Sequence, residues 1–219
     1  MTLSKWFMAA GAVLIGLSAC GPLNEGSTAS QLGGLVMGRV TGAETQPVPG
    51  SSVPQDQILS NPGKYIRVNI RDLNRWDTSV QAGSNANRAT WVDSANISVT
   101  FENGIVVATR GLVRDLMAAD VSQSWAAIRS GGGEAQRVHE FLTNMDGIST
   151  ELLQCRIASQ GREVVERLQI KQNTTRFEEK CGNENLQFAN VYWVNDAGTI
   201  IRSLQAISPD AGYLQIDIF

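Results

Sequence analysis

Much of the chain alternates between hydrophobic and polar residues with the two-residue period of a half-buried β-strand. Residues 64–70 show this pattern first, and residues 97–101 repeat it. Asn103 and Gly104 follow the second segment, and this residue pair favours a two-residue hairpin turn because both residues accept a positive φ. The pattern therefore predicts a β-hairpin around these two residues.

From residue 149 onward the alternation is nearly continuous and is interrupted only by short polar segments. The predicted strands are residues 151–159, 164–171, 174–181, 188–194, 199–207 and 213–219. The predicted turns are Gln160-Gly161 and residues 182–185, 195–198 and 209–212. Strands at this spacing are typical of an antiparallel sheet that curls on itself.

Two segments have a different pattern. Residues 71–88 are rich in Asn, Asp, Gly and Ser, which predicts a long loop around Trp76. In residues 112–128 the apolar positions recur at helical spacing, and the glycine-rich residues 130–133 end this segment. We therefore expect a mainly β fold, a curved antiparallel sheet (sandwich, barrel or half-barrel) with one or two short helices, at the margin of the α+β class.

The N-terminus has the layout of a bacterial lipoprotein signal peptide. Lys5 precedes an apolar run at residues 6–17, and Leu17-Ser18-Ala19-Cys20 matches a lipobox. A lipobox cysteine becomes the acylated N-terminus, so we expect lipidation at Cys20. The two alternatives are a membrane-spanning helix, for which the run is too short, and an ordinary signal peptide that contains a cysteine.

This assignment divides the chain into three parts. Residues 1–19 are the signal peptide, and residues 20–50 are a lipidated N-terminus and flexible tether, because they are rich in Gly, Ser, Thr, Ala and Pro. Residues 51–219 form a single β-rich domain. Gly21 rather than Asp follows the lipidated cysteine, which favours the outer membrane over the inner one. We expect a domain that faces the periplasm.

Two cysteines remain after Cys20 is assigned to lipid, and they lie in a compartment that oxidises thiols. Cys155 and Cys181 each share a strand face with apolar residues, so both are expected to point inward. A disulfide between them is the simpler interpretation. A catalytic thiol is the alternative, although no histidine lies near either cysteine in the sequence.

Composition excludes several classes of function. The formal net charge is −3, which argues against binding nucleic acid. His139 is the only histidine, so we expect neither a metal site nor a Ser-His-Asp triad. The carboxylates Asp115, Asp120 and Glu140 are the remaining acid-base candidates, and we expect them to be solvated charges. The sequence thus predicts no catalytic residues, no metal and no cofactor.

Two longer stretches carry a family resemblance. FENGIVVATRGLVRDLMAAD at residues 101–120 and NVYWVNDAGTIIRSLQAISPDAGYLQIDI at residues 190–218, together with the lipobox, resemble the YjbF/GfcB family of lipoproteins. Members of this family are encoded with capsule or exopolysaccharide secretion genes in Gram-negative bacteria. The resemblance implies an accessory role in polysaccharide export or assembly, in contact with other secretion proteins or with the polysaccharide itself. It implies no catalytic residues.

Three hypotheses follow. The first is the anchored accessory lipoprotein; the second is a periplasmic carrier that binds a lipid or lipid-linked glycan in a β cavity; the third is a polysaccharide-modifying enzyme. An aromatic face suits the C–H face of a sugar ring. The residues proposed for such stacking, with core packing as the alternative, are Trp76, Trp91, Trp125, Tyr192 and Trp193.

Overall fold

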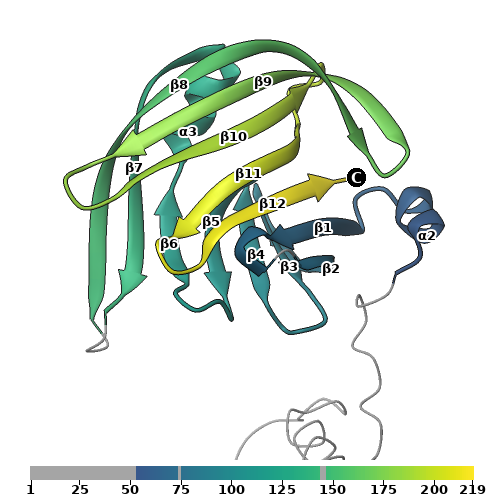
Figure 1. Ribbon diagram of the computed structural model, residues 1–219, viewed down its shortest axis with the longest axis horizontal. Helices are drawn as coiled ribbons and strands as arrows, with labels where there is room; N and C mark the ends of the chain where they lie inside the picture. Colours follow the sequence, from purple (N-terminus) through teal and green to yellow (C-terminus); the bar gives the residue numbers. More distant parts are fainter. Residues whose placement is uncertain (1–52, 74, 144–146) are drawn as a thin grey trace, which may run out of the picture. The chain divides into compact units, whose positions relative to one another are not determined.

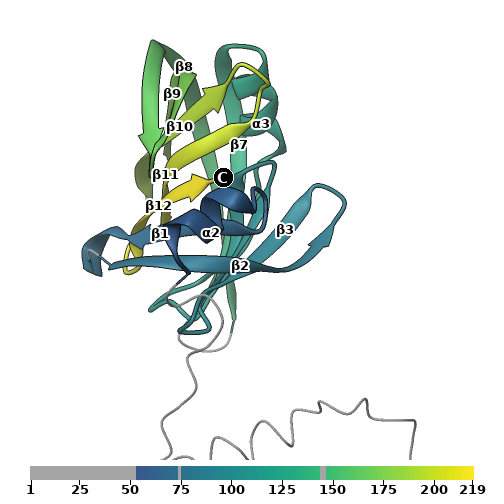
Figure 2. The same ribbon diagram turned by 90° about the vertical axis from the view of Figure 1, so that its right-hand side faces the viewer.

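A single antiparallel sheet of twelve strands curves into a nearly closed barrel (Figure 1, Figure 2). The computed structural model describes residues 53–73, 75–143 and 147–219, so Cys20, the signal peptide and residues 20–50 lie outside them. Within the described residues no helix is long and apolar enough to span a membrane. The predicted fold class is confirmed, and the sheet takes the barrel form.

The strands follow one another around the sheet in the order β5-β4-β3-β2-β1-β12-β11-β10-β9-β8-β7-β6. Their bounds are β1 Tyr65–Ile70, β2 Arg75–Asn85, β3 Arg88–Val92, β4 Ser98–Glu102, β5 Ile105–Arg110, β6 Leu116–Asp120, β7 Gly132–Leu142, β8 Ile148–Arg167, β9 Ile170–Gly182, β10 Gln187–Asn195, β11 Ile200–Ser208 and β12 Gly212–Ile218. The helices are α2 Gln55–Ser60, α3 Ser122–Arg129 and the short 3-10 helix η1 Arg71–Leu73.

Side chains hold together the two edges of the sheet, β5 and β6. The Thr109 hydroxyl donates a hydrogen bond to Asp115 and accepts one from the backbone N–H of Leu116, at 2.8 and 3.0 Å. Arg110 donates to the carbonyl oxygen of Leu116 at 3.2 Å. β5 and β6 do not pair through backbone hydrogen bonds, so the barrel is nearly but not fully closed. The side-chain bonds connect the two edges instead.

The apolar positions of the alternating segments point into the barrel. Ile66 of β1 and Leu214 and Ile216 of β12 are fully buried, because these two strands pair antiparallel with their apolar faces on the same side. Helix α3 packs against β7 and β8 and adds Ala127 and Ile128 to the same core. The two-residue period therefore indicates which side chains of a strand point into the barrel.

Two predicted turns are confirmed. Asn103 and Gly104 join β4 to β5 with φ values of 52° and 85°, and glycine adopts such a conformation without strain. Between β10 and β11 the Asn195 side chain accepts hydrogen bonds from the backbone N–H groups of Ala197 and Thr199. Both turns have a local signal, an Asn-Gly pair in one and an Asn side chain that bonds its own loop in the other, which is why the sequence could indicate them.

The loop predicted for residues 71–88 is wrong. η1 and β2 occupy most of this segment, and β2 pairs with β1 on one side and with β3 on the other. Residues 81–85 of β2 are mostly exposed on both faces, so their side chains show no alternation. A polar strand still forms there because the neighbouring strand satisfies its backbone hydrogen bonds.

The helix predicted for residues 112–128 is correct only for its second part, α3. Residues 116–120 form β6, and the pairing of β6 with β7 shifts register between Leu116 and Ala118. This bulge turns both Leu116 and Ala119 toward the interior. Two buried residues three positions apart resemble a helical repeat, and this misled the sequence-based prediction.

The turn predicted at Gln160-Gly161 is also wrong. β8 continues through these residues, with a register shift between Ser159 and Arg162 and a φ of 97° at Gly161. The chain reverses instead at Leu168, where φ is 52°. The predicted strand 151–159 and the first part of the predicted strand 164–171 therefore belong to the one long strand β8, whereas residues 170–171 already belong to β9.

Candidate functional site

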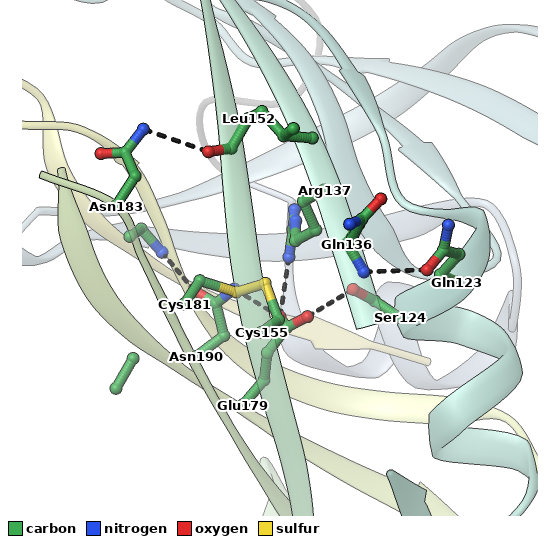
Figure 3. The surroundings of a disulfide bond; sticks show 12 residues. Gln123, Ser124, Gln136, Arg137, Leu152, Cys155, Glu179, Cys181, Asn183 and Asn190 are labelled. Atoms are coloured by element: carbon green, nitrogen blue, oxygen red, sulfur yellow. Dashed lines mark hydrogen bonds and ion pairs between the residues drawn. A yellow bond between two sulfur atoms is a disulfide. The ribbon is translucent and has the colours of Figure 1, made fainter. Parts of the chain in front are cut away.

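A disulfide joins β8 to β9. Cys155 and Cys181 are direct cross-strand partners, both are buried, and their sulfur atoms are bonded (Figure 3). The Glu179 carboxylate lies within 4.8 Å of both sulfurs, a grouping that in a reduced protein could hold a metal ion. Because metal ligation needs thiolates, the disulfide takes both sulfurs out of that role.

A buried ion pair lies next to the disulfide, inside the barrel (Figure 3). Glu179 of β9 is 0% exposed and Arg137 of β7 is 2% exposed, and Arg137 Nη1 lies 2.7 Å from Glu179 Oε2. The same oxygen accepts hydrogen bonds from Asn190 and from the Tyr192 hydroxyl, at 2.8 and 2.7 Å, and Oε1 accepts one from Ser124 of α3. We call these five residues the Glu179 cluster.

The Glu179 cluster keeps its carboxylate ionised. Burial by itself would raise the pKa of Glu179, but the Arg137 charge and the hydrogen bonds from Ser124, Asn190 and Tyr192 lower it below its usual value. Burial and the neighbouring carboxylate raise the pKa of Tyr192 well above its usual value. Four donors hold this carboxylate in place away from solvent, so the cluster ties β7, β9, β10 and α3 together.

The sequence analysis missed the Glu179 cluster, although a signal for part of it exists. Glu179 lies two residues from Phe177 and two from Cys181, so strand alternation places it on the interior face. A charge at an inward position implies a buried partner. The partner itself, Arg137, lies on β7, which is not adjacent to β9 in the sheet, and no local pattern identifies it.

His139 is a neutral aromatic residue of the core. It is 1% exposed, its ring stacks on Phe188 at a centroid distance of 5.4 Å, and the edge of Phe141 lies 5.9 Å away. Neither ring nitrogen has a hydrogen-bond partner among the described residues. Burial, and then the Arg137 charge, lower the pKa of His139 to about 3.

This environment makes the stability of the protein dependent on pH. The folded-state pKa lies below the ordinary value of about 6.5, so the unfolded chain binds the proton more tightly and stability falls as pH decreases below 6.5. Each pH unit in this window costs about 1.4 kcal/mol for one group, or roughly 2 kcal/mol at pH 5. We expect a His139→Phe variant to lose this contribution, so that its urea unfolding free energy changes less than that of the wild type between pH 7 and pH 5. Equal changes in both proteins would contradict the assignment.

The three candidate carboxylates have no arrangement that indicates catalysis. Asp115 accepts hydrogen bonds from Thr109 and from the backbone N–H of Gly111, and so shapes the loop between β5 and β6. Asp120 accepts the backbone N–H of Ser122 at the start of α3, a bond that lowers its pKa. Glu140 alternates with the buried His139 and therefore lies on the outer face of β7. Structural roles account for Asp115 and Asp120.

The five aromatic candidates are not brought together. Tyr192 is fully buried in the Glu179 cluster and Trp91 is 8% exposed in the core, so neither ring offers a face to a glycan in this structure. Trp125 packs partly against the core from α3. Trp193 is half-buried on the outer face of β10, where Arg176 lies 5.9 Å from its ring centroid. Trp76 is 39% exposed on β2 and is the most open of the five.

Trp76 lies in a pocket on the outer face of the barrel, which we call the Trp76 pocket. Its volume is about 280 Å³, and its walls include Ile58 of α2, Leu168 at the β8–β9 turn, Arg67 of β1 and Thr78 of β2. The guanidinium carbon of Arg67 lies 4.7 Å from the Trp76 ring centroid. A pocket with an aromatic ring, a cation and polar groups has the ingredients of a small-molecule site.

Comparison with protein families assigns the chain to a known family. The family described as "Group 4 capsule polysaccharide lipoprotein gfcB, YjbF" matches residues 44–219. The chain belongs to this YjbF family. The resemblance drawn from the two sequence stretches and the lipobox is thereby confirmed.

Solved structures support the fold of this YjbF-family chain. The crystal structure of the hypothetical lipoprotein YmcC from Escherichia coli K12 is similar, with a TM-score of 0.62 over 86% of this chain and 96% of that chain. The two sequences are 13% identical, so this likeness concerns the fold alone. No curated protein matches the chain.

The barrel interior is filled over the described residues of this YjbF-family chain. Apolar side chains from across the sheet form one continuous cluster, and the Glu179 cluster occupies the part next to α3. The space between Val68, Val99 and Leu214 measures about 10 Å³, at most enough for one water molecule. This packing argues against the carrier alternative, which needs an interior cavity large enough for an acyl chain.

Proposed function

We propose that this protein is an outer-membrane-anchored periplasmic lipoprotein that acts as an accessory factor in the export or assembly of capsule or exopolysaccharide. The observation that carries the proposal is the family match over residues 44–219, whose description names a capsule polysaccharide lipoprotein. The lipobox at residues 17–20 supports the lipid anchor, and Gly21 supports the outer membrane. A non-enzymatic role is part of the proposal.

In this proposal the protein works through its outer surface. The packed core and the buried, ion-paired Glu179 carboxylate favour binding over chemistry. The partners are other polysaccharide secretion proteins, the polysaccharide itself, or both. The composition of residues 20–50 predicts a tether, and a flexible chain of about 30 residues would have an r.m.s. span of roughly 30 Å, enough for the domain to move off the membrane surface without crossing the periplasm.

The test is the amount of secreted polysaccharide in cells that lack this gene. We expect output to fall several-fold and to be restored by the wild-type gene but not by Cys20→Ala, because the latter lacks the acylated residue. A second variant replaces residues 1–20 with a cleavable secretory signal peptide, so that an unanchored domain reaches the periplasm. This control separates loss of the anchor from failure to leave the cytoplasm.

Unchanged polysaccharide output in the deletion strain would contradict the proposed function. Full restoration by the unanchored domain would leave a role in secretion but contradict the need for the lipid anchor. Membrane fractionation of the wild-type protein provides the third readout, and recovery in the inner-membrane fraction would contradict the proposed location.

A further inference from the structure

We propose that the Trp76 pocket binds an acidic sugar residue of a polysaccharide, with Arg67 pairing with the sugar carboxylate and Trp76 contacting the C–H face of the ring. This inference rests on the proposed function, because it assumes that the protein meets a polysaccharide. It adds the chemical class of the ligand and the residues that recognise it.

The first argument is that Arg67 has no carboxylate partner among the described residues. Its cross-strand neighbour on β12 is Asp217. Both oxygens of Asp217 are already engaged by Arg202, through Nε at 2.5 Å and Nη2 at 2.9 Å. The acid directly across from Arg67 on β12 is therefore neutralised by another arginine, and the Arg67 guanidinium lies over Trp76 of β2 instead.

The other acid at the pocket is occupied as well. Asp77 lines the Trp76 pocket, but it accepts hydrogen bonds from Arg75 at 3.3 Å, from the Ser94 hydroxyl and from the backbone N–H of Thr78. Arg75 is shared between Asp77 and the nearer Asp93, whereas Arg67 is the charged side chain of the pocket that forms no ion pair with the described residues. An arginine in this state favours an external anion, and its planar fork suits a carboxylate.

The second argument is the aromatic surface. Arg67 lies over the Trp76 ring, and such a contact holds the guanidinium in place beside the indole. The ring is still 39% exposed. A saturated sugar ring presents C–H groups that suit the negative face of an indole, whereas its hydroxyl and carboxylate groups suit polar neighbours. Because Arg67 covers one face of the indole, the sugar contacts the opposite face and the edge of Trp76, and its carboxylate reaches Arg67 past the ring edge.

The third argument is size and polarity. The volume of about 280 Å³ is at the lower limit for small-molecule pockets, which suits one sugar residue of a chain rather than a whole oligosaccharide. The side chains of Gln55 and Thr78 add hydrogen-bonding groups to the wall. An acyl chain would leave these polar groups and the Arg67 charge unsatisfied.

The experiment uses the purified full-length lipoprotein in detergent, labelled with 5-fluorotryptophan. The ¹⁹F resonance of Trp76 is identified by its absence in a Trp76→Phe variant. Trigalacturonate and a hyaluronan tetrasaccharide are the acidic probes, and the methyl ester of trigalacturonate is the neutral control. We expect an acidic probe to shift the Trp76 resonance and the ester to leave it unchanged.

Arg67→Gln should weaken binding of the responding probe by about tenfold or more, because it removes a charge-assisted contact. Arg176→Gln is the matched control. Arg176 and Trp193 also form a cross-strand arginine–tryptophan pair on the outer face, at a centroid distance of 5.9 Å, so this substitution removes the same charge in a similar setting. We expect it to leave the affinity unchanged.

Several outcomes would overturn the inference. These are the absence of a Trp76 response to both acidic probes, an equal response to the methyl ester, and an equal loss of affinity in the Arg67 and Arg176 variants. In cells, normal secretion by the Arg67→Gln strain alongside a defect in the deletion strain would refute the site but retain the proposed function. A normal deletion strain would refute the function while the binding measurements still stand.

Discussion

Replacing Glu179 with leucine is expected to lower the free energy of unfolding by about 3–5 kcal/mol, because it leaves a buried arginine without its partner. Arg137 is 2% exposed on the inner face of β7, so water cannot replace the lost carboxylate. Ser124, Asn190 and Tyr192 also lose the acceptor that they share. Urea unfolding followed by tryptophan fluorescence measures the change.

An exposed ion pair provides the control for this prediction. Arg162 and Asp196 also approach to 2.7 Å, but both side chains are more than half exposed. Asp196→Asn should leave the unfolding midpoint unchanged, because solvent screens such pairs. A double variant, Arg137→Met with Glu179→Leu, should recover part of the stability by removing the unpaired charge. A Glu179→Leu protein as stable as the wild type would show that the cluster does not hold the barrel together.

Removing the disulfide has the second largest expected effect. The bond closes a loop of 26 residues between Cys155 and Cys181. The entropy of that loop in the unfolded chain predicts a loss of about 3 kcal/mol when both cysteines are replaced by alanine. Urea unfolding under oxidising conditions compares the double alanine variant with the wild type.

Reductant supplies the control. Wild-type protein unfolded and refolded in reductant should match the alanine variant within the small difference due to the side chains. The stability of the variant should not depend on reductant, because the described residues contain no cysteines other than Cys155 and Cys181, and the variant lacks both. Equal stability of the oxidised and reduced wild type would contradict a stabilising disulfide.

Two errors of the sequence-based prediction have the same cause. β1, which was predicted correctly, pairs in regular register with both of its neighbours and keeps the two-residue period. β6 and β8 contain register shifts, and each shift breaks the period. At Leu116 and Ala119 the break resembled a helix, and at Gly161 it resembled a turn. A bulge depends on the partner strand, so the single strand does not reveal it.

For the site, local sequence could indicate which face of a strand a residue occupies but not which residues meet. It placed Cys155 and Cys181 on inward faces. It also identified five aromatic residues as candidates for stacking on a sugar ring, but it could not indicate which of them are exposed. The sheet order decided that Tyr192 and Trp91 are buried and that Trp76 is open.

The sequence by itself determined the β class, the hairpin turns at residues 103–104 and 195–198, the inward cysteines and the family to which the chain belongs. Only the tertiary structure decided that Glu179 pairs with Arg137 and that Arg202, rather than Arg67, neutralises Asp217. The reason is that a residue's face depends on its nearest neighbours in the chain, whereas its partners depend on the register of strands far apart in the sequence.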